Sequence, residues 1–291
     1  MTTQHDQARY LLLTPPGDPG SARLRYGAAM TLYQAGEISA EVLEVYRSCA
    51  SLDAQDVQAL LAGYGLPSPM AAEKAIGALL AAIDGYLATL SGPWIADVRQ
   101  GVAATSKTPI SREVVLPNPV VAQYLEGALR SAEQDVPGLV SAIRAASPHL
   151  CWIPYDGYDP HLIGADFAQG HAFTLIIGAD APIKAKDFDL GLFLIAPHVL
   201  YRDHNHAAPE LYAPITGPHG WRFGVGTPLV IKPAHHPIWN EPFAPHLTKV
   251  GPVPFLCIFA WTADVTAAAQ LIPAPDWATL EALRIGGCDA G

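Results

Sequence analysis

The spacing of apolar residues divides the chain into two parts. From Ser21 to about Leu90 they recur every three or four residues, as in SARLRYGAAMTLYQAG, which predicts three or four packed helices. Ser39 precedes AEVLEVYRSCA and is expected to cap that helix. A second helical stretch begins at PNPVVAQYLEG and ends at Pro148. We therefore predict a helical region over residues 21–148, after a loose tail over residues 1–20 that has no apolar period.

After CWIPYDGYDP the pattern of apolar residues changes from a helical period to short runs. Short runs rich in β-branched and aromatic residues, such as HAFTLIIG, DLGLFLIAP, TPLVIK and PFLCIFAW, are separated by Gly, Pro, Asp and His. This pattern predicts an antiparallel β-barrel or sandwich over residues 149–272. APDWATLEALR, with Asp276 as the expected N-cap, predicts a last helix within residues 273–291.

Composition and charge narrow the classes of partner. The formal net charge is −10 and no Lys/Arg cluster is present, which argues against nucleic acid and anionic membranes as partners. AIGALLAAIDGYLATL contains Asp84 and follows Lys74, so we expect a buried helix, not a membrane span, and a cytoplasmic protein.

The four cysteines, which lack CxxC spacing, are expected to be free and mostly buried thiols: Cys49, Cys151, Cys257 and Cys288. GxGxxG, GxxxxGK and GxSxG motifs do not occur in the sequence.

The stretch YRDHNHAAPELYAPITG carries the candidate chemistry. His204 and His206 are two residues apart, so both imidazoles would lie on one face of a strand. A straight strand would carry Glu210 about 13 Å from His206, whereas ligands of one ion lie within about 4 Å of each other. The chain must therefore turn at AAP, where Pro209 marks a strand edge. Tyr212 would then share a face with Glu210.

A further ligand should come from a later strand. PAHHPIWNEPFAPHLTKV contains three histidines, of which His246 stands in the strand-like PHLTKV, whereas His235 and His236 precede a proline and fit a loop. His204, His206, Glu210 and His246 form a ligand set suited to a divalent transition metal such as Fe, Mn, Zn, Ni or Co. Three further histidines, His171, His198 and His219, are expected to lie in turns or strands without a metal.

These residues carry a resemblance to a known superfamily. His204, His206, Glu210 and Gly217 fit the first motif of the cupin barrels, HxHxxxExxxxxxG, and His246 fits the histidine of the second. The longer pattern LGLFLIAPHVLYRDHNHAAPELYAPITG, HGWRF and PAHHPIWNEPFAPHLTKVGPVPFLCIFAW resembles the dimethylsulfoniopropionate (DMSP) lyases among the cupins. The resemblance covers about Asn118 to Asp264. It departs from the family at Arg202, where members usually have proline.

The resemblance implies an α+β fold, with a C-terminal, jelly-roll-like cupin antiparallel β-barrel after an N-terminal helical region. It also implies a carbon–sulfur lyase that cleaves DMSP, a small-molecule substrate, to dimethyl sulfide and acrylate by β-elimination. It implies His204 or His206, with Glu210 and His246, as metal ligands. Tyr212 is the expected catalytic base, and Tyr201 is a second active-site tyrosine. Because a sulfonium binds aromatic faces, Trp221, Trp239 and Trp261 are candidate substrate contacts, although tryptophans are also frequent in cores.

Two other functions stay open at this stage. One is a different metal-dependent cupin enzyme, such as a dioxygenase or isomerase acting on a small carboxylate or sugar. The other is a non-catalytic cupin that senses a small molecule. The sequence does not fix the native metal or the role of the helical region, and it leaves the oligomeric state open, with a homodimer as one option.

Overall fold

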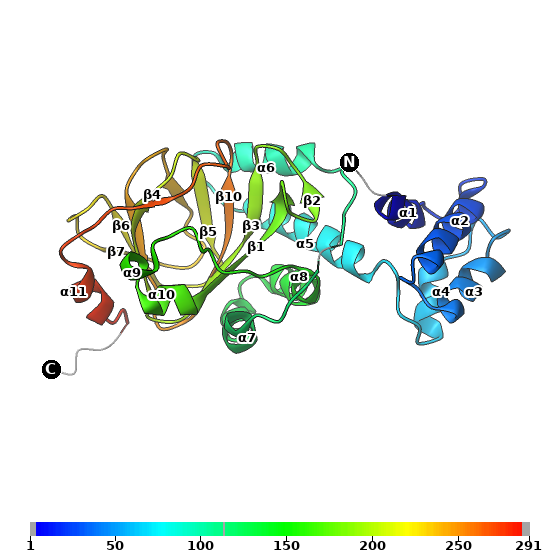
Figure 1. Ribbon diagram of the computed structural model, residues 1–291, viewed down its shortest axis with the longest axis horizontal. Coiled ribbons are helices and arrows are strands. Elements are labelled where there is room, and N and C mark those ends of the chain that lie inside the picture. Colours follow the sequence, from blue (N-terminus) through cyan, green and yellow to red (C-terminus); the bar gives the residue numbers. More distant parts are fainter. Residues whose placement is uncertain (1–3, 113, 287–291) are drawn as a thin grey trace. The chain divides into compact units, whose positions relative to one another are not determined.

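The N-terminal helices form a unit of their own. The structure, a computed structural model, describes residues 4–112 and 114–286 (Figure 1). Its contacts divide these residues into two compact units, residues 4–77 with 108–112 and residues 78–107 with 114–286. The first unit contains α1 (Gln4–Leu12), α2 (Ser21–Gln34), α3 (Ala40–Ser48), α4 (Val57–Gly63) and the start of α5 (Ala71–Leu87), which continues into the second.

Helix α1 lies in the stretch for which the sequence predicts a loose tail. Ala8 and Leu12 are one turn apart, so they share a face of the helix. Both are buried in a core that also contains Leu32 and Tyr46. The helix is stabilised by tertiary contacts to later helices, and a local apolar pattern does not reveal such contacts.

The helix caps differ in how far the sequence predicts them. The cap at Ser39 is confirmed, since its side chain accepts a hydrogen bond from the Val42 N–H. Asn118 caps α7 (Pro119–Ala132) in the same way. Asp276 stands at the N-cap position of α11 (Trp277–Ala282), but its side chain makes no capping bond and contacts Arg222 instead.

The second unit combines further helices with two β-sheets. Its remaining helices are α6 (Ile95–Ala104), α8 (Pro137–Ala146), the short 3₁₀ helix η1 (Ser147–His149), α9 (Pro160–Ile163) and α10 (Ala165–Gly170). One sheet, in the order β2-β1-β3-β10-β5-β8, contains β2 (Ile183–Lys184), β1 (His171–Gly178), β3 (Asp189–Ile195), β10 (Phe255–Trp261), β5 (Glu210–Pro214) and β8 (Ile238–Asn240). The other, in the order β11-β4-β9-β6-β7, contains β11 (Gln270–Leu271), β4 (Leu200–Asn205), β9 (His246–Lys249), β6 (His219–Phe223) and β7 (Val230–Lys232).

The two sheets pack on each other through one hydrophobic core. That core joins Phe193 and Tyr212 of the six-stranded sheet to Tyr201 and Trp221 of the five-stranded sheet. Within the two sheets, only the short pairing of β1 with β2 is parallel. The predicted α+β fold with jelly-roll-like antiparallel sheets is therefore confirmed, in the form of two facing sheets and not of a closed barrel.

An irregularity in the pairing of strand β4 with β9 determines which of its side chains point into the core. Strand β4 pairs with β9 at Tyr201 and again at His204, with a register shift between the two positions. Residues three apart on a regular strand point to opposite faces, yet the rings of Tyr201 and His204 stack at 3.9 Å between centroids. The extra residue of a β-bulge gives this result. It places both side chains inside, while Arg202 lies over the Trp277 ring.

Buried charges connect β4 and β6 to the last helix. Arg222 is almost fully buried, and its Nε donates to Asp203 at 3.0 Å. Asp203 also accepts from the Trp277 Nε1–H at 2.7 Å. Because a buried charge is costly without a partner, these bonds hold α11 against the outer face of the strand that carries His204.

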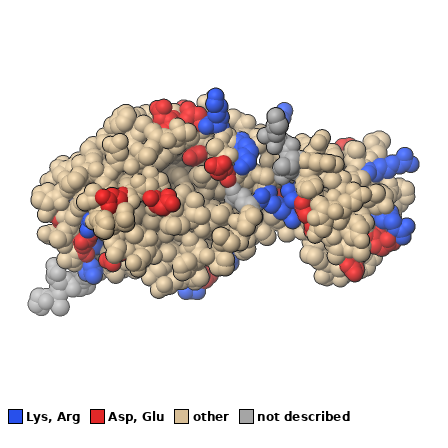
Figure 2. Space-filling model, in the orientation of Figure 1, with Lys and Arg blue, Asp and Glu red and all other residues tan. Residues whose placement is uncertain are grey.

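On the face shown in Figure 2, acidic and basic side chains are scattered over a surface formed mostly by other residues. Cys49 and Cys257 are buried free thiols, as predicted; Cys151 is partly buried, and Cys288 lies outside the described residues. In the described part of the chain, every helix, including α5, is too short or too polar to cross a bilayer.

We predict that Asp203→Ala lowers the free energy of unfolding of the second unit by about 3 kcal/mol, because it leaves the Arg222 guanidinium buried beside an empty position. The measurement is urea unfolding followed by tryptophan fluorescence, since all six tryptophans lie in this unit. Glu133→Ala is the matched control, because Glu133 pairs with Arg144 at an exposed site. Equal losses in the two variants would contradict the structural role of Asp203.

Candidate metal centre and aromatic cavity

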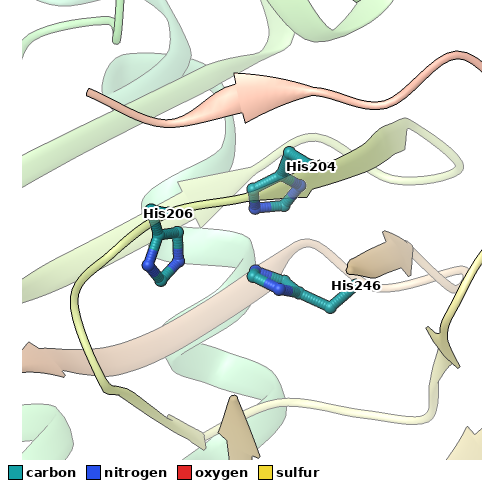
Figure 3. A group of neighbouring side chains, drawn as sticks. All are labelled: His204, His206 and His246. Carbon is teal, nitrogen blue, oxygen red and sulfur yellow. The ribbon is translucent and has the colours of Figure 1, made fainter. Parts of the chain in front are cut away.

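Three histidines from the five-stranded sheet and the turn after it converge on one point. His204 on β4 is the direct cross-strand partner of His246 on β9, and His206 follows the end of β4. One ring nitrogen from each residue lies within 4.8 Å of the other two, and all three side chains are buried. Figure 3 shows the three imidazoles directed toward one another. The sequence prediction that these histidines form one cluster agrees with this geometry.

Backbone carbonyl groups set which nitrogen of each imidazole faces the cluster. In each histidine, Nδ1 lies close to a carbonyl oxygen two residues away. The distances are 2.8 Å from His204 to Arg202, 2.8 Å from His206 to Ala208 and 2.9 Å from His246 to Ala244. A carbonyl oxygen only accepts, so each Nδ1 carries a hydrogen.

In the neutral imidazoles, Nε2 then presents a lone pair to the cluster. Nε2 of His204 and Nε2 of His246 are buried without a hydrogen-bond partner among the described residues. Orphaned buried acceptors pointing at a common centre are what a metal ion would satisfy.

Glu210 approaches the same centre from the six-stranded sheet. Its Oε2 lies 3.3 Å from Nε2 of His206 and 3.4 Å from Nε2 of His246. The turn predicted at AAP brings it there, because Glu210 is the first residue of β5. The centre therefore combines imidazole nitrogens from one sheet with a carboxylate from the other.

The neighbours of Glu210 on both sides hold its carboxylate in place. Glu210 is paired with Trp261 on β10 and with Asn240 on β8. The Trp261 Nε1–H donates to Oε1 at 2.7 Å, and the Asn240 amide donates to Oε2 at 2.8 Å. These two bonds fix the carboxylate while leaving lone pairs for a cation.

The electrostatics favour cation binding. Burial, followed by the charges of the neighbouring histidines, lowers the pKa of His204 well below its ordinary value. Burial alone would raise the pKa of Glu210, but the adjacent His206 and His246 side chains hold that pKa well below the usual range. Burial alone would lower the pKa of His206, but the neighbouring Glu210 raises it, so an ion bound there would take the place of the proton shared by this pair. Neutral imidazole and anionic carboxylate are the ligand forms that divalent transition metals require, so the residues present fit such an ion.

A cavity of about 220 Å³ adjoins this centre, and Glu210 is part of its wall. Alternate residues of β1, β3, β10 and β5 point into it, as the two-residue period of a sheet dictates. Its aromatic lining consists of Phe173, Phe193, Phe259, Trp261 and Tyr212 from this sheet, Tyr201 from β4, and Tyr155 and Tyr158 from the segment before β1. A metal centre at the edge of an aromatic cavity can hold a small organic ligand in contact with both.

The tyrosines of the cavity are strongly buried. Burial, followed by the charge of Glu210, raises the pKa of Tyr212 well above its ordinary value, and a hydrogen bond with Glu210 acts in the same direction. Burial also raises the pKa of Tyr201, whose hydroxyl lies 2.6 Å from that of Tyr158. Both phenols are protonated unless a positive charge lies close by.

The candidate tryptophans occupy three different environments. Trp261 lines the cavity and lies against His206, with 4.6 Å between ring centroids. Trp221 is buried beside Tyr212, outside the cavity lining. Trp239 packs against Trp94 with 4.0 Å between ring centroids and donates to Glu241, also outside the cavity lining. Only Trp261 of these three is placed to touch a ligand in this cavity.

The structure adds residues that the sequence analysis did not name. Tyr158 contacts Tyr201, Asn240 holds Glu210, and Asp189 lines the cavity. Asn240 immediately follows the singled-out Trp239, and Tyr158 stands in the noted CWIPYDGYDP, but neither has a motif of its own. Cross-strand register, which sequence spacing does not supply, places Asn240 and Asp189. Tyr158 lies in the segment before α9 and reaches Tyr201 only through the tertiary fold.

Comparisons with known proteins identify the family of the chain. Residues 99–257 match the family model of dimethylsulfoniopropionate lyase. The dimethylsulfoniopropionate lyase DddQ of Ruegeria pomeroyi is 25% identical over 114 residues, which cover 39% of this chain and 56% of that protein. The match thus spans little more than half the length of this curated relative.

Solved structures support the same fold. A chain from the crystal structures of the DMSP lyases RdDddP and RnDddQII aligns with a TM-score of 0.55 and 18% identity, covering 69% of this chain and all of that one. DddQ from Ruegeria pomeroyi DSS-3 aligns with a TM-score of 0.50 and 20% identity, covering 68% of this chain and 96% of that one. Because the family model matches more than half of its residues, the chain belongs to the dimethylsulfoniopropionate lyase family.

Proposed function

We propose that this protein is a carbon–sulfur lyase that cleaves DMSP to dimethyl sulfide and acrylate by metal-dependent β-elimination. The observation that carries the proposal is the buried cluster of imidazole Nε2 atoms and the Glu210 carboxylate at the wall of an aromatic cavity. Family membership supports the choice of substrate. The barrel region over residues 149–272 would then be the metal-binding domain.

His204, His206, Glu210 and His246 would hold the ion, which we expect to be Fe, Mn, Zn, Ni or Co. A divalent cation bound there would polarise the substrate carboxylate, stabilise the charge that develops as the α-proton leaves, and favour the phenolate of Tyr212. The hydrogen bonds from Nδ1 to backbone carbonyls and from Asn240 to Glu210 fix these ligands in advance. Ligand positions set beforehand lower the cost of ordering the site when the ion binds.

Tyr212 is the proposed base. It lies two residues after Glu210 on β5, faces the same cavity and interacts with the Glu210 carboxylate. Its phenolate oxygen takes the proton from the α-carbon of DMSP. The electrons of that C–H bond form the double bond of acrylate, the bond between the β-carbon and sulfur breaks, and its electron pair leaves with neutral dimethyl sulfide.

Tyr201 and Tyr158 have a positioning role in this proposal. Their hydroxyl groups are hydrogen-bonded, and the Tyr201 ring stacks on the His204 imidazole. The pair therefore holds one metal ligand in orientation and presents hydroxyl groups to the cavity. The sulfonium of the substrate, which has no hydrogen-bond donor, would lie against aromatic faces such as that of Trp261. Trp221, by contrast, would support the Tyr212 ring from behind.

The substrate and reaction class are tested together. Protein reconstituted with each candidate metal is incubated with DMSP while dimethyl sulfide in the headspace, acrylate in solution and dissolved oxygen are measured. The proposal predicts equal amounts of the two products and no oxygen uptake. Oxygen consumption without dimethyl sulfide would favour a dioxygenase, and binding of DMSP without turnover would favour a sensor; either result contradicts the lyase assignment.

The metal ligands are tested by metal content. His246→Ala removes one of the nitrogens and should lower bound metal from about one ion per chain to a small fraction after dialysis, because three ligands remain where four are needed. The control is His161→Ala, since His161 is exposed and lies on α9 away from the cluster. Retention of the full metal content in His246→Ala would exclude His246 as a ligand.

The base is tested by Tyr212→Phe. We expect this variant to keep its fold and metal content while kcat falls by roughly 100-fold or more, the usual effect of losing a general base. Tyr86→Phe is the matched control, because Tyr86 is also a buried tyrosine of this unit but its hydroxyl bonds to the Pro214 carbonyl and His235. Unchanged turnover in Tyr212→Phe would rule out the assignment.

A further inference from the structure

A second carboxylate lies in the same row of side chains as Glu210. Asp189 on β3 is the direct cross-strand partner of Trp261 on β10, and Trp261 in turn is the partner of Glu210 on β5. All three residues line the cavity. Adjacent strands are about 4.8 Å apart, so the backbones at the two carboxylates are separated by about 10 Å, with the Trp261 indole between them.

The Asp189 carboxylate has no partner within the described part of the protein. The structure gives it no hydrogen bond and no ion pair, whereas Glu210 receives bonds from Asn240 and Trp261. Burial, followed by the negative charges of Asp187 and Asp180, raises the pKa of Asp189 to about 6. A half-buried anion without a counter-charge is costly, so a cation from outside the chain would relieve it.

Glycine on the neighbouring strand provides the space for this carboxylate. A Cβ atom at Gly178 on β1 would lie 2.6 Å from Oδ1 of Asp189, closer than non-bonded atoms approach. Asp189 therefore rests against bare backbone at the edge of the cavity.

The surroundings of Asp189 select the kind of cation. A metal ion needs several oxygen or nitrogen ligands, and Asp189 is the only carboxylate on this side of Trp261 among the residues that line the cavity. An ammonium with N–H groups needs several acceptors, whereas this wall is formed by Phe259, Trp261 and aliphatic side chains. A methylated sulfonium or quaternary ammonium needs only negative charge and aromatic faces.

We propose that Asp189 is the anionic contact for the onium group of the ligand, and that it selects cationic over neutral substrates of the same shape. This inference rests on the proposed function for the identity of the ligand. DMSP has two methylene groups between its charges, so it can lie across Trp261 with its carboxylate at the metal centre and its sulfonium toward Asp189. The Cβ–S bond that breaks would then be held over the indole, with the α-carbon toward Tyr212.

The test uses two unreactive ligands of equal shape. One is 3-(trimethylammonio)propionate, and the other is 4,4-dimethylpentanoate, in which a carbon replaces the charged nitrogen. Binding to metal-loaded protein is measured by calorimetry at pH 8, where the Asp189 carboxyl is ionised. Asp189→Asn should weaken binding of the cationic ligand roughly tenfold and change binding of the neutral one by less than about twofold.

Two further variants make the test specific. Asp187→Asn removes an acidic group just before β3 that does not line the cavity, and it should leave both affinities unchanged. Asp189→Glu keeps the charge and should retain most of the preference for the cationic ligand. Equal weakening of both ligands in Asp189→Asn, or no weakening of either, would overturn the inference.

The same measurements separate this inference from the proposed function. If wild-type protein binds the cationic ligand in an Asp189-dependent way but releases no dimethyl sulfide from DMSP, the onium site stands and the lyase assignment fails. If DMSP is cleaved and Asp189→Asn leaves both KM and the ligand preference unchanged, the lyase assignment stands and Asp189 is not the onium contact.

Discussion

The proposed metal centre depends on four side chains that the scaffold holds in fixed positions: three imidazoles and one carboxylate. Each imidazole donates from Nδ1 to a carbonyl oxygen of its own local backbone, and the Glu210 carboxylate accepts from Asn240 and Trp261, its cross-strand neighbours on both sides. The Nε2 atoms and one side of the carboxylate are thereby left to face one another in the buried interior. Buried polar groups remain unsatisfied only where something else completes them, so this arrangement is the physical reason to regard the cluster as a metal centre and not as a satisfied core.

The proposed centre also requires side chains from both sheets. The imidazoles come from the five-stranded sheet and the turn after β4, and the carboxylate comes from the six-stranded sheet. The six-stranded sheet also forms the cavity wall, since its alternate residues place Glu210, Trp261 and Asp189 in one row and Tyr212 and Phe259 in the next. On the five-stranded sheet, the bulge in β4 turns Tyr201 and His204 inward together and leaves Asp203 outside, bound to Arg222 and Trp277. Strand β4 therefore carries a residue of the proposed centre on one face, and on its other face it contacts the last helix.

Local sequence spacing predicted the part of this site that is close along the chain. The HxH pair, the turn before Glu210 and the isolated strand histidine His246 could each be read from neighbouring residues, and the helical and strand regions follow their apolar periods. The partners of Glu210 could not, because Asn240 and Trp261 lie 30 and 51 residues away and meet it only through strand register. The same limit explains Trp221 and Trp239, whose types fit a ligand contact but whose strands direct them elsewhere, and helix α1, which depends on contacts with α2 and α3.

The claim that one ion joins both sheets is tested most directly by X-ray absorption at the edge of the metal retained by the purified protein. The account predicts a first shell at about 2.0–2.2 Å that contains three imidazole nitrogens, recognised by the multiple scattering of their rings, and at least one carboxylate oxygen that disappears in Glu210→Ala. A shell with fewer imidazoles, or one that Glu210→Ala leaves unchanged, would contradict a centre shared between the two sheets.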